Sequence, residues 1–346
     1  MREARQTGKS PIDTSTCLVY GAIPGSEALR SNIASQHENL SSENVLITQG
    51  AIAANFLTLY TLVGPGDHVI CVYPTYQQLY SVPQSLGADV TLWKLKAENG
   101  FVPDVAELEA LVRPNTKMII INNPNNPTGA SIPRSVLAAL VDTARARDIT
   151  ILSDEVYRPL FHDLHDDDAA AAMPPSITGL GYDKVIATGS MSKAYALAGI
   201  RIGWIASPNA ALLARLALAR DYTTISVSQL DDQVATYALA PAVRTPLLRR
   251  NVALARTNRA LVEAFVDAHA GNGEPVDDVA FAKDVLDKTK VFFVPGSKCF
   301  GDGEDFKGYV RIGSSIFAAA VEGPRCIRCK YIGQSLGHVL VYWVVG

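Results

Sequence analysis

The amino-acid sequence predicts an α/β fold, in which a mostly parallel sheet is covered by helices on both faces. Short runs of β-branched and apolar residues recur between residues 68 and 190, and segments of helical spacing lie between most of them. One such segment, Pro133–Asp148, opens with a proline, which is favourable at the start of a helix. Because apolar strands alternating with helices are typical of buried parallel sheets, we expect a three-layer αβα domain.

Four of the apolar runs are predicted to be strands of this sheet. They are the segments His68–Tyr73, Lys117–Asn122, Thr150–Glu155 and Lys184–Ser190. Polar clusters follow three of them, at residues 122–129, 154–157 and 190–193. Ligands of open α/β sheets bind beyond the carboxyl ends of the strands. We therefore expect the functional site where these three clusters meet.

A smaller α+β domain is predicted from the change of pattern after residue 204. Long helical segments there replace the alternation of strands and helices, and they end in a mixed region at residues 277–297. The expected division is a large domain of residues 41–240 and a smaller domain of residues 1–40 and 241–346.

Composition and charge narrow the class of protein. Lys and Arg total 31 and Asp and Glu total 34, so the net charge is −3 and no nucleic-acid or anionic membrane surface is expected. No apolar run approaches the roughly 20 residues of a membrane span, and the N-terminus lacks the apolar segment of a signal peptide. The five cysteines are scattered, as in reduced cytoplasmic proteins, and the lone CxxC of Cys326 and Cys329 has no second ligand pair for a metal.

The stretch GSMSKAYALAGIRIGW, residues 189–204, sets one lysine among small and hydroxyl residues. Ser190 lies three residues before Lys193 and Arg201 lies eight after it, and a hydroxyl with a guanidinium suits a phosphate dianion. Gly50 and Ala51 are expected to open a helix, whose free N–H groups also bind anions. Any single lysine is more often solvated, but a lysine beside a phosphate pocket indicates a phosphorylated aldehyde held as a Schiff base. The cofactor that fits is pyridoxal 5′-phosphate (PLP).

PLP makes further demands, and the sequence offers a residue for each. Asp154 follows a predicted strand and can keep the pyridine nitrogen protonated. Asn126 and Tyr157 can donate hydrogen bonds to the phenolate oxygen, and Tyr76 can stack on the ring. Arg311 can bind the α-carboxylate of an amino acid with both arms of its guanidinium. Each of these residues taken alone could instead be a helix cap, a core aromatic or a member of a surface ion pair. The prediction therefore depends on finding all of them together in this order along the chain.

With these residues in place, the chain resembles the fold-type I, class I/II PLP-dependent aminotransferases over residues 20–314. The motifs that carry the resemblance are NNPNNPTGA, SDEVYRPL, GSMSKAYALAGIRIGW and YVRIGSS. It implies that Lys193 forms the internal Schiff base and later moves the substrate proton. The cofactor-binding residues that it implies are Gly50, Ala51, Ile52, Tyr76, Asn126, Asp154, Tyr157, Ser190, Lys193 and Arg201. Asn126 and Arg311 would face the substrate.

The resemblance also implies a homodimer. Tyr20, before GAIPGSEALR, is similar to the tyrosine that family members lend to the phosphate in the neighbouring subunit's site. The chain departs from the family pattern in three places: it begins close to Tyr20, it lacks a glycine-rich strand segment near residue 270, and residues 315–346 match nothing in the family. We expect these departures to weaken stability, dimerisation and substrate binding more than cofactor binding.

The predicted function is transfer of an amino group between an amino acid and a 2-oxo acid through the Lys193 Schiff base. Two alternatives stay open: a PLP-dependent lyase or an elimination or cyclisation enzyme, and a truncated PLP-binding protein with little activity. The motifs around the cofactor do not separate them, because substrate-facing residues decide the fate of the reacting carbon. A nucleotide-binding protein is disfavoured, because the sequence holds no G-x-x-x-x-G-K-[ST] loop.

Overall fold

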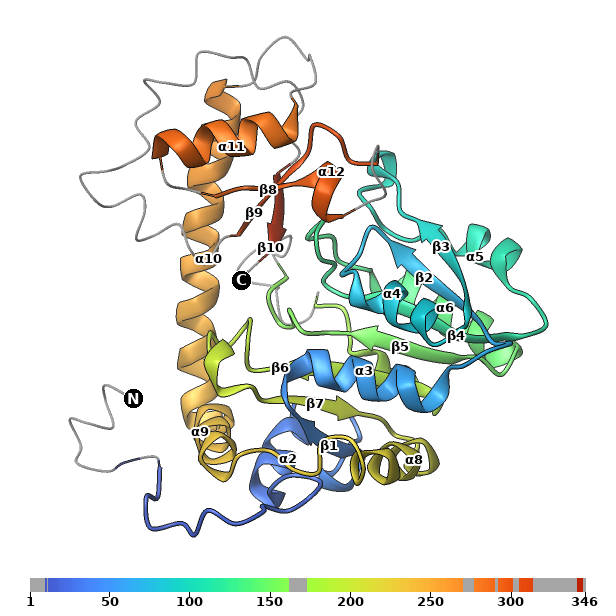
Figure 1. The fold of residues 1–346 in the computed structure, drawn as a ribbon, viewed down its shortest axis with the longest axis vertical. Helices are drawn as coiled ribbons and strands as arrows, with labels where there is room; N and C mark the ends of the chain where they lie inside the picture. Colours follow the sequence, from blue (N-terminus) through green and yellow to red (C-terminus); the bar gives the residue numbers. More distant parts are fainter. Residues whose placement is uncertain are drawn as a thin grey trace.

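A computed structural model describes residues 10, 12–161, 173–269, 277–289, 292–300, 305–313 and 341–344 of the chain. These residues form a seven-stranded sheet and a three-stranded sheet, which the long helix α10 (Pro241–His269) connects (Figure 1). No helix in these ranges combines the length and the apolar character that crossing a membrane requires.

The seven-stranded sheet has the order β1-β7-β6-β5-β4-β2-β3, and every strand runs parallel to the others except β7. The strands are β1 (Val45–Thr48), β2 (His68–Tyr73), β3 (Asp89–Lys94), β4 (Thr116–Asn122), β5 (Thr150–Asp154), β6 (Val185–Ser190) and β7 (Gly203–Ala206). Strands β1, β2, β5, β6 and β7 are buried along their whole length. The four predicted strands are confirmed as β2, β4, β5 and β6.

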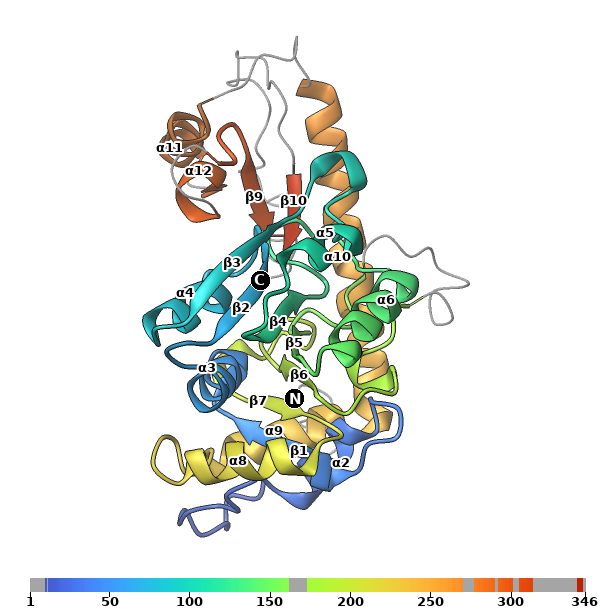
Figure 2. The ribbon, with the colours of Figure 1, turned by 90° about the vertical axis from the view of Figure 1, so that its right-hand side faces the viewer.

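Helices cover both faces of this sheet, which confirms the three-layer prediction (Figure 2). One face packs against α3 (Gly50–Leu62), α4 (Gln78–Ser85) and α8 (Ala210–Arg220). The other face packs against α5 (Val105–Leu111) and α6 (Arg134–Ala146), with α2 (Glu27–Ala34) and α9 (Gln229–Leu239) over its β1 end. Short 3₁₀ helices lie in the connections: η1 (Ser42–Asn44), η2 (Ala97–Asn99), η3 (Ile177–Gly179) and η4 (Ala198–Ile200).

Helix α6 illustrates why the sequence pattern was informative. It buries Leu137, Leu140, Val141 and Ala144 against the sheet, which is the spacing of one helical face. Pro133 stands at its N-cap with extended backbone, so the helix begins at the residue after the proline. The helix predicted over 133–148 is therefore confirmed, with both ends shortened.

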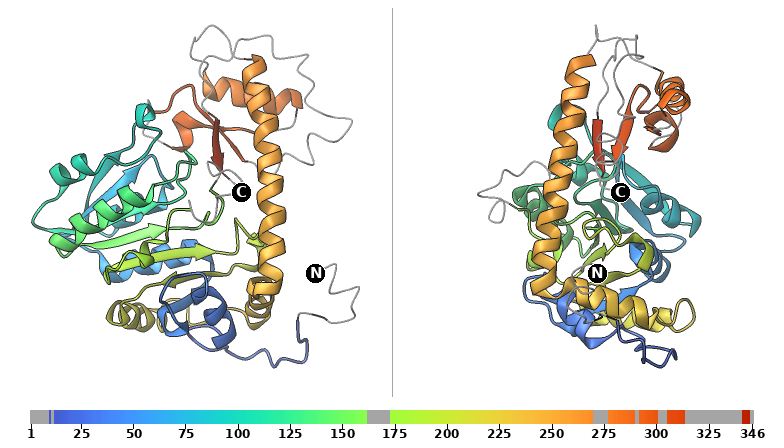
Figure 3. Two further views of the ribbon diagram at one scale, coloured as in Figure 1. Left: turned by 180° about the vertical axis from the view of Figure 1, so that it is seen from behind. Right: turned by 90° about the vertical axis from the view of Figure 1, so that its left-hand side faces the viewer.

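The three-stranded sheet lies at the other end of α10. It has the order β10-β9-β8, with β8 (Val294–Pro295), β9 (Val310–Gly313) and β10 (Val341–Val344). Helices α11 (Asp278–Thr289) and α12 (Gly296–Cys299) accompany it (Figure 3). Strand β10 comes from the C-terminal segment that matches nothing in the family pattern, and it pairs in parallel with β9. That segment therefore supplies a strand to the small sheet.

Candidate functional site

Lys193 lies in the turn that follows β6, close enough to two guanidinium groups for their charges to act on its amine. Its pKa is lowered by partial burial and then by the positive charges of Arg311 and Arg201. Its Nζ lies 5.8 Å from the centre of the Tyr157 ring. The two arginines come from different parts of the chain, since Arg201 follows the same turn and Arg311 belongs to β9. The amine is thus within electrostatic range of two arginines, each of which can bind an anionic group.

The first anion-binding place lies where α3 begins. Gly50 has a φ of 79°, and a Cβ built on it would lie 2.5 Å from Nη2 of Arg201, so the guanidinium rests directly on the glycine. The N-cap residue Gln49 makes no side-chain hydrogen bond to the first turn of α3. Free amides at a helix N-terminus and an arginine together suit a phosphate group. Gly50, Ala51 and Arg201 are therefore brought together as the sequence predicted.

The hydroxyl groups of Ser190 and Ser192 lie beside this place. Their contacts differ from the prediction, which assigned the phosphate contact to Ser190. The Ser190 hydroxyl is buried and lies 3.0 Å from the carbonyl oxygen of Ile202 and 2.9 Å from the hydroxyl of Ser192. The Ser192 hydroxyl accepts a hydrogen bond of 3.3 Å from Nη1 of Arg201. Ser192 was not singled out from the sequence, although it lies within the same motif. The Ser190 hydroxyl thus stabilises the turn, and the Ser192 hydroxyl is the one that contacts Arg201.

Asp154 is the last residue of β5 and is buried. One of its carboxylate oxygens accepts a hydrogen bond of 2.8 Å from the Asn55 amide, and the other accepts one of 3.0 Å from the backbone N–H of Val156. Burial raises the pKa of Asp154 to about 6, although both hydrogen bonds lower it. A buried carboxylate of this kind is stabilised by a cationic partner, such as a protonated pyridine nitrogen.

Asn55 and Thr188 complete this arrangement, and sequence analysis missed both. The Thr188 hydroxyl donates to Oδ1 of Asn55 at 2.7 Å, and the Asn55 amide donates to Asp154. Both residues are buried. The available signal was a single amide at position 55 on the mostly apolar, buried side of helix α3.

The second anion-binding place is built from both sheets. Nη1 of Arg311, on β9, donates a hydrogen bond of 3.3 Å to Oδ1 of Asn126, which follows β4. Asn126 is fixed in turn by a bond of 2.6 Å from its backbone N–H to Oδ1 of Asn122. The Arg311 guanidinium also lies 5.6 Å from the centre of the Phe300 ring. The predicted pair Asn126 and Arg311 is therefore in contact.

The tyrosines lie in two different settings. Tyr157 is buried, and its pKa is raised by burial first; Arg311 lowers it, while Asp154 and Tyr76 raise it. Tyr76, before α4, is 40% exposed and belongs to the same neighbourhood. Tyr20 is 79% exposed in the N-terminal segment, where the neighbouring Val19 carbonyl accepts a bond from Gln229. The structure of a single chain does not bring Tyr20 to the other predicted residues.

The described residues provide a suitable group for each functional part of PLP. An anion cradle at Arg201, an amine at Lys193 and a buried carboxylate at Asp154 are what a phosphate, an aldehyde and a pyridine nitrogen require. Arg311 adds a place for the carboxylate of a substrate. Ile52 lies in the first turn of α3 with its side chain 49% exposed, so its contribution there is its backbone amide.

Comparisons with known proteins agree with this geometry. The family described as aminotransferase class I and II matches residues 1–268. The arginine–pyruvate transaminase of Pseudomonas aeruginosa is 33% identical over 72% of this chain and 63% of its own length. Capreomycidine synthase of Streptomyces vinaceus is 34% identical over 72% of this chain and 62% of its own length. The chain therefore spans slightly less than two thirds of these two relatives.

Solved structures show the same architecture. A PLP-dependent aminotransferase from Streptococcus suis superposes with a TM-score of 0.78 at 39% identity, covering 87% of this chain and 83% of that chain. An aspartate aminotransferase from Thermotoga maritima superposes with a TM-score of 0.72 at 24% identity, covering 87% of this chain and 88% of that chain. The second likeness, at its lower identity, supports the fold alone.

Proposed function

The chain belongs to the class I and II aminotransferases, and on that premise we propose that it transfers an amino group between an amino acid and a 2-oxo acid. The cofactor of this family, and hence of this chain, is PLP. The observation that carries the proposal is a half-buried Lys193 amine beside the Tyr157 ring, with its pKa lowered by burial and by the charges of Arg311 and Arg201. Both charges and partial burial favour its neutral form, which is the form that acts as a nucleophile or a base.

Each residue of the site has a proposed task. Arg201 and the amides at the start of α3 hold the phosphate, and Asp154 holds the proton on the pyridine nitrogen. When bound, PLP supplies an electron-withdrawing ring that stabilises negative charge at the substrate Cα. Lys193 is the amine linked to the cofactor, and it then moves the proton at the substrate Cα.

Arg311 is proposed to orient the substrate. Its guanidinium can bind the α-carboxylate bidentately, and the bond to Asn126 keeps it aimed into the site. A fixed carboxylate places the Cα–H bond beside Lys193, which converts an encounter into a positioned reaction. Binding the α-carboxylate is common to all amino acids, so the proposal extends to the substrate class and not to one side chain.

A second outcome is favoured by one finding. A relative of 34% identity is named capreomycidine synthase, and not a transaminase. We therefore keep a PLP-dependent lyase, elimination or cyclisation reaction as the alternative. It would use the same residues until the proton is removed from the substrate Cα. It would differ in the reaction that the substrate undergoes after that step.

The experiment that separates these outcomes is a half-reaction. The purified protein with bound PLP is mixed with single amino acids, without an acceptor, and the absorbance of the bound cofactor is followed. Transamination converts the cofactor from its aldehyde to its amine form and releases one 2-oxo acid per site. Product release with the aldehyde form retained identifies the alternative reaction. If no amino acid changes the spectrum although PLP is bound, the catalytic proposal is wrong.

We also propose that the chain acts as a homodimer. Helix α3 exposes Ile52, Phe56 and Tyr60 at intervals of four residues, with exposed fractions of 49%, 44% and 43%. The rings of Phe56 and Tyr60 stack with centres 5.8 Å apart. An apolar stripe on the helix whose first turn forms the phosphate site suits an interface beside that site. Tyr20, exposed on the same chain, would then reach the partner's site.

Light scattering after size exclusion tests the dimer. The wild-type chain is expected to elute with the mass of two chains, and Phe56→Glu with the mass of one. Leu254→Glu is the control, because this residue is a similarly exposed apolar side chain on α10. If Phe56→Glu keeps the mass of the wild-type chain, the interface is elsewhere.

A further inference from the structure

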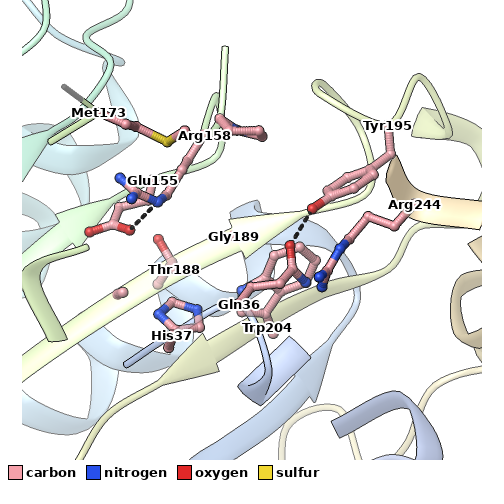
Figure 4. Close-up of a pocket in the computed structure, with 12 residues that line it drawn as sticks. Gln36, His37, Glu155, Arg158, Met173, Thr188, Gly189, Tyr195, Trp204 and Arg244 are labelled. Carbon is pink, nitrogen blue, oxygen red and sulfur yellow. Dashed lines mark hydrogen bonds and ion pairs between the residues drawn. The ribbon is translucent and has the colours of Figure 1, made fainter. Parts of the chain in front are cut away.

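A second cavity lies on the face of the large sheet opposite helix α3. Its volume is about 230 Å³, which at about 30 Å³ per water has room for about eight non-hydrogen atoms. Of its lining residues, Thr188 also contacts the proposed cofactor site, through the bond from its hydroxyl to Asn55. Those drawn and labelled in Figure 4 are Gln36, His37, Glu155, Arg158, Met173, Thr188, Gly189, Tyr195, Trp204 and Arg244.

The cavity lies behind Asp154 because side chains alternate along an extended chain. Asp154 faces Asn55 on the α3 side, so the next residue, Glu155, faces the other side of the sheet. Oε1 of Glu155 accepts bonds of 2.9 Å from the N–H of Ile177 and 3.1 Å from the hydroxyl of Ser153. Oε2 of this buried carboxylate has no hydrogen-bond partner among the described residues, and Nε of Arg158 lies 4.0 Å away. Because buried polar atoms are usually hydrogen-bonded, this oxygen is suited to accept a hydrogen bond from a ligand.

The other end of the cavity is positive. Among the described residues, the bonds that Arg244 donates are long, at 3.4 Å to the carbonyl oxygen of Asn32 and 3.3 Å to the hydroxyl of Ser35. The Tyr195 hydroxyl donates to Oε1 of Gln36 at 2.6 Å and can still accept a hydrogen bond. Figure 4 places Tyr195 and Arg244 at one end and Glu155 at the other. One end therefore presents the Arg244 guanidinium, and the other presents Glu155, whose Oε2 has no described hydrogen bond and lies 4.0 Å from Nε of Arg158.

We propose that this cavity binds a small amino carboxylate as a zwitterion, with its ammonium group at Glu155 and its carboxylate at Arg244. The ammonium group can donate a hydrogen bond to Oε2 of Glu155, which has no described partner. The carboxylate can accept hydrogen bonds from the Arg244 guanidinium, whose described bonds are long. Arg158 is less free to serve, because its Nη1 already donates to the carbonyl oxygen of Pro174 at 2.7 Å. The inference rests on the cavity alone and does not depend on the proposed reaction.

A ligand in the cavity would act on the cofactor site through contacts that already exist. The backbone N–H of Glu155 donates to the Thr188 carbonyl at 2.8 Å, and Thr188 bonds to Asn55, which bonds to Asp154. The charge of Glu155 also raises the pKa of Asp154. An ammonium group beside Glu155 offsets that charge, so occupancy favours the ionised Asp154 that the cofactor needs. The cavity is therefore placed to regulate the enzyme by the level of an amino acid.

Calorimetric titration of the PLP-bound enzyme with L-proline tests the site. Proline is a zwitterion of suitable size, and its secondary amine cannot take part in transamination. We expect saturable binding of one proline per chain, at least about tenfold weaker in Arg244→Met and in Tyr195→Phe. Arg249→Met is the matched control, since Arg249 is an exposed arginine on the same helix. Arg311→Met should leave proline binding unchanged, because it alters the other site.

Two analogues of proline test whether the cavity needs both the ammonium group and the carboxylate. Pyrrolidine carries the amine alone and tetrahydrofuran-2-carboxylate carries the carboxylate alone, so both are expected to bind at least about tenfold more weakly than proline. Equal binding of the carboxylate analogue would overturn the zwitterion, and so would proline binding that Arg311→Met abolishes but Arg244→Met does not. The absence of saturable proline binding to the wild-type enzyme would show a cavity that holds only water, and the inference would fall.

Discussion

The two halves of the catalytic site are held in different ways. The cofactor half lies on the large sheet, where Asp154, Asn55 and Thr188 are buried and joined by bonds of 2.8 and 2.7 Å. The substrate half depends on Arg311 of the small sheet, which bonds to Asn126 at 3.3 Å; before β9, Tyr73 donates to Asp305 at 3.3 Å and Phe306 packs against the core of the large sheet. Buried, fully bonded networks are rigid, whereas longer bonds at a partly exposed edge are more easily rearranged. The difference suggests a fixed cofactor and an adjustable substrate position.

The largest effect is expected from the residue shared by both halves. Lys193→Ala should reduce transamination by about 10⁴-fold or more, because one amine both holds the cofactor and moves the proton. It should also remove the pyridoxyl label that borohydride reduction leaves on the chain. Lys184→Ala, at the residue before β6, is the control and should change neither quantity. A label found on another lysine would refute the assignment.

Changing the buried centre of the cofactor half comes next. Asp154→Ala should cost about 3–5 kcal/mol of transition-state stabilisation, the scale for losing one partner of a buried ion pair. Some PLP should stay bound, because Arg201 and the α3 amides hold the phosphate end. Single-turnover kinetics of Cα proton removal measure the loss. Turnover close to that of the wild-type enzyme would remove Asp154 from its role.

A smaller and different effect is expected in the substrate half. Arg311→Ala should raise KM for amino acids by the equivalent of about 2–4 kcal/mol, the scale for truncating a desolvated charge pair. PLP affinity should change little, because no cofactor group is assigned to Arg311. Steady-state kinetics and equilibrium dialysis of PLP separate the two quantities. If PLP affinity falls as much as KM rises, the two halves are not separate.

The pH dependence of stability probes Asp154 without any substrate. Its pKa is about 6 in the fold and 3.8 without the fold, so between these values the native state binds more protons than the unfolded state. The free energy of unfolding of the cofactor-free protein should therefore fall as pH rises through this window, by up to about 3 kcal/mol. Asp154→Asn should remove the decline. Urea unfolding at a series of pH values measures both, and an equal decline in the variant would contradict the prediction.

The smallest effect is expected one residue further from the cofactor. Asn55→Leu removes the hydrogen bond that lowers the pKa of Asp154, so this pKa should rise further. The acid limb of the kcat/KM profile should move to higher pH, and activity near neutrality should fall by about 1–2 kcal/mol equivalent. Thr58→Val is the control, because this buried hydroxyl of the same helix bonds only within the helix. An unshifted acid limb in Asn55→Leu would show that Asn55 does not tune the carboxylate.

The large sheet was the more predictable half because its signals are local. Strands β2, β4, β5 and β6 are continuous apolar runs, and the chemistry follows their ends in recognisable clusters. Strands β1 and β7, of four residues each, are too short to stand out in a sequence. Strand β3 is exposed at its edge position and carries mixed residues, so it gives no apolar run.

The parts of the site that escaped prediction depend on contacts distant in sequence. Asn55 becomes informative only when α3 lies across β5 and β6, which brings it to Asp154 and Thr188. Arg311 was found because it lies in a family motif, yet its bond to Asn126 joins residues 185 positions apart. The role of β10 was hidden because the segment around it resembles nothing in the family. The division into domains at residues 41 and 240 stays a prediction.

The one antiparallel strand of the large sheet has a geometric consequence. Ser190 on β6 pairs directly with Gly203 on β7, so residues 191–202 form a closed loop whose two ends are clamped side by side. Lys193 stands near one end of that loop and Arg201 near the other. The span from the reactive amine to the phosphate anchor is thus measured within a single hairpin, and not across a crossover or a domain boundary. The separation of these two residues therefore depends on the pairing of β6 with β7 and not on the position of the small sheet.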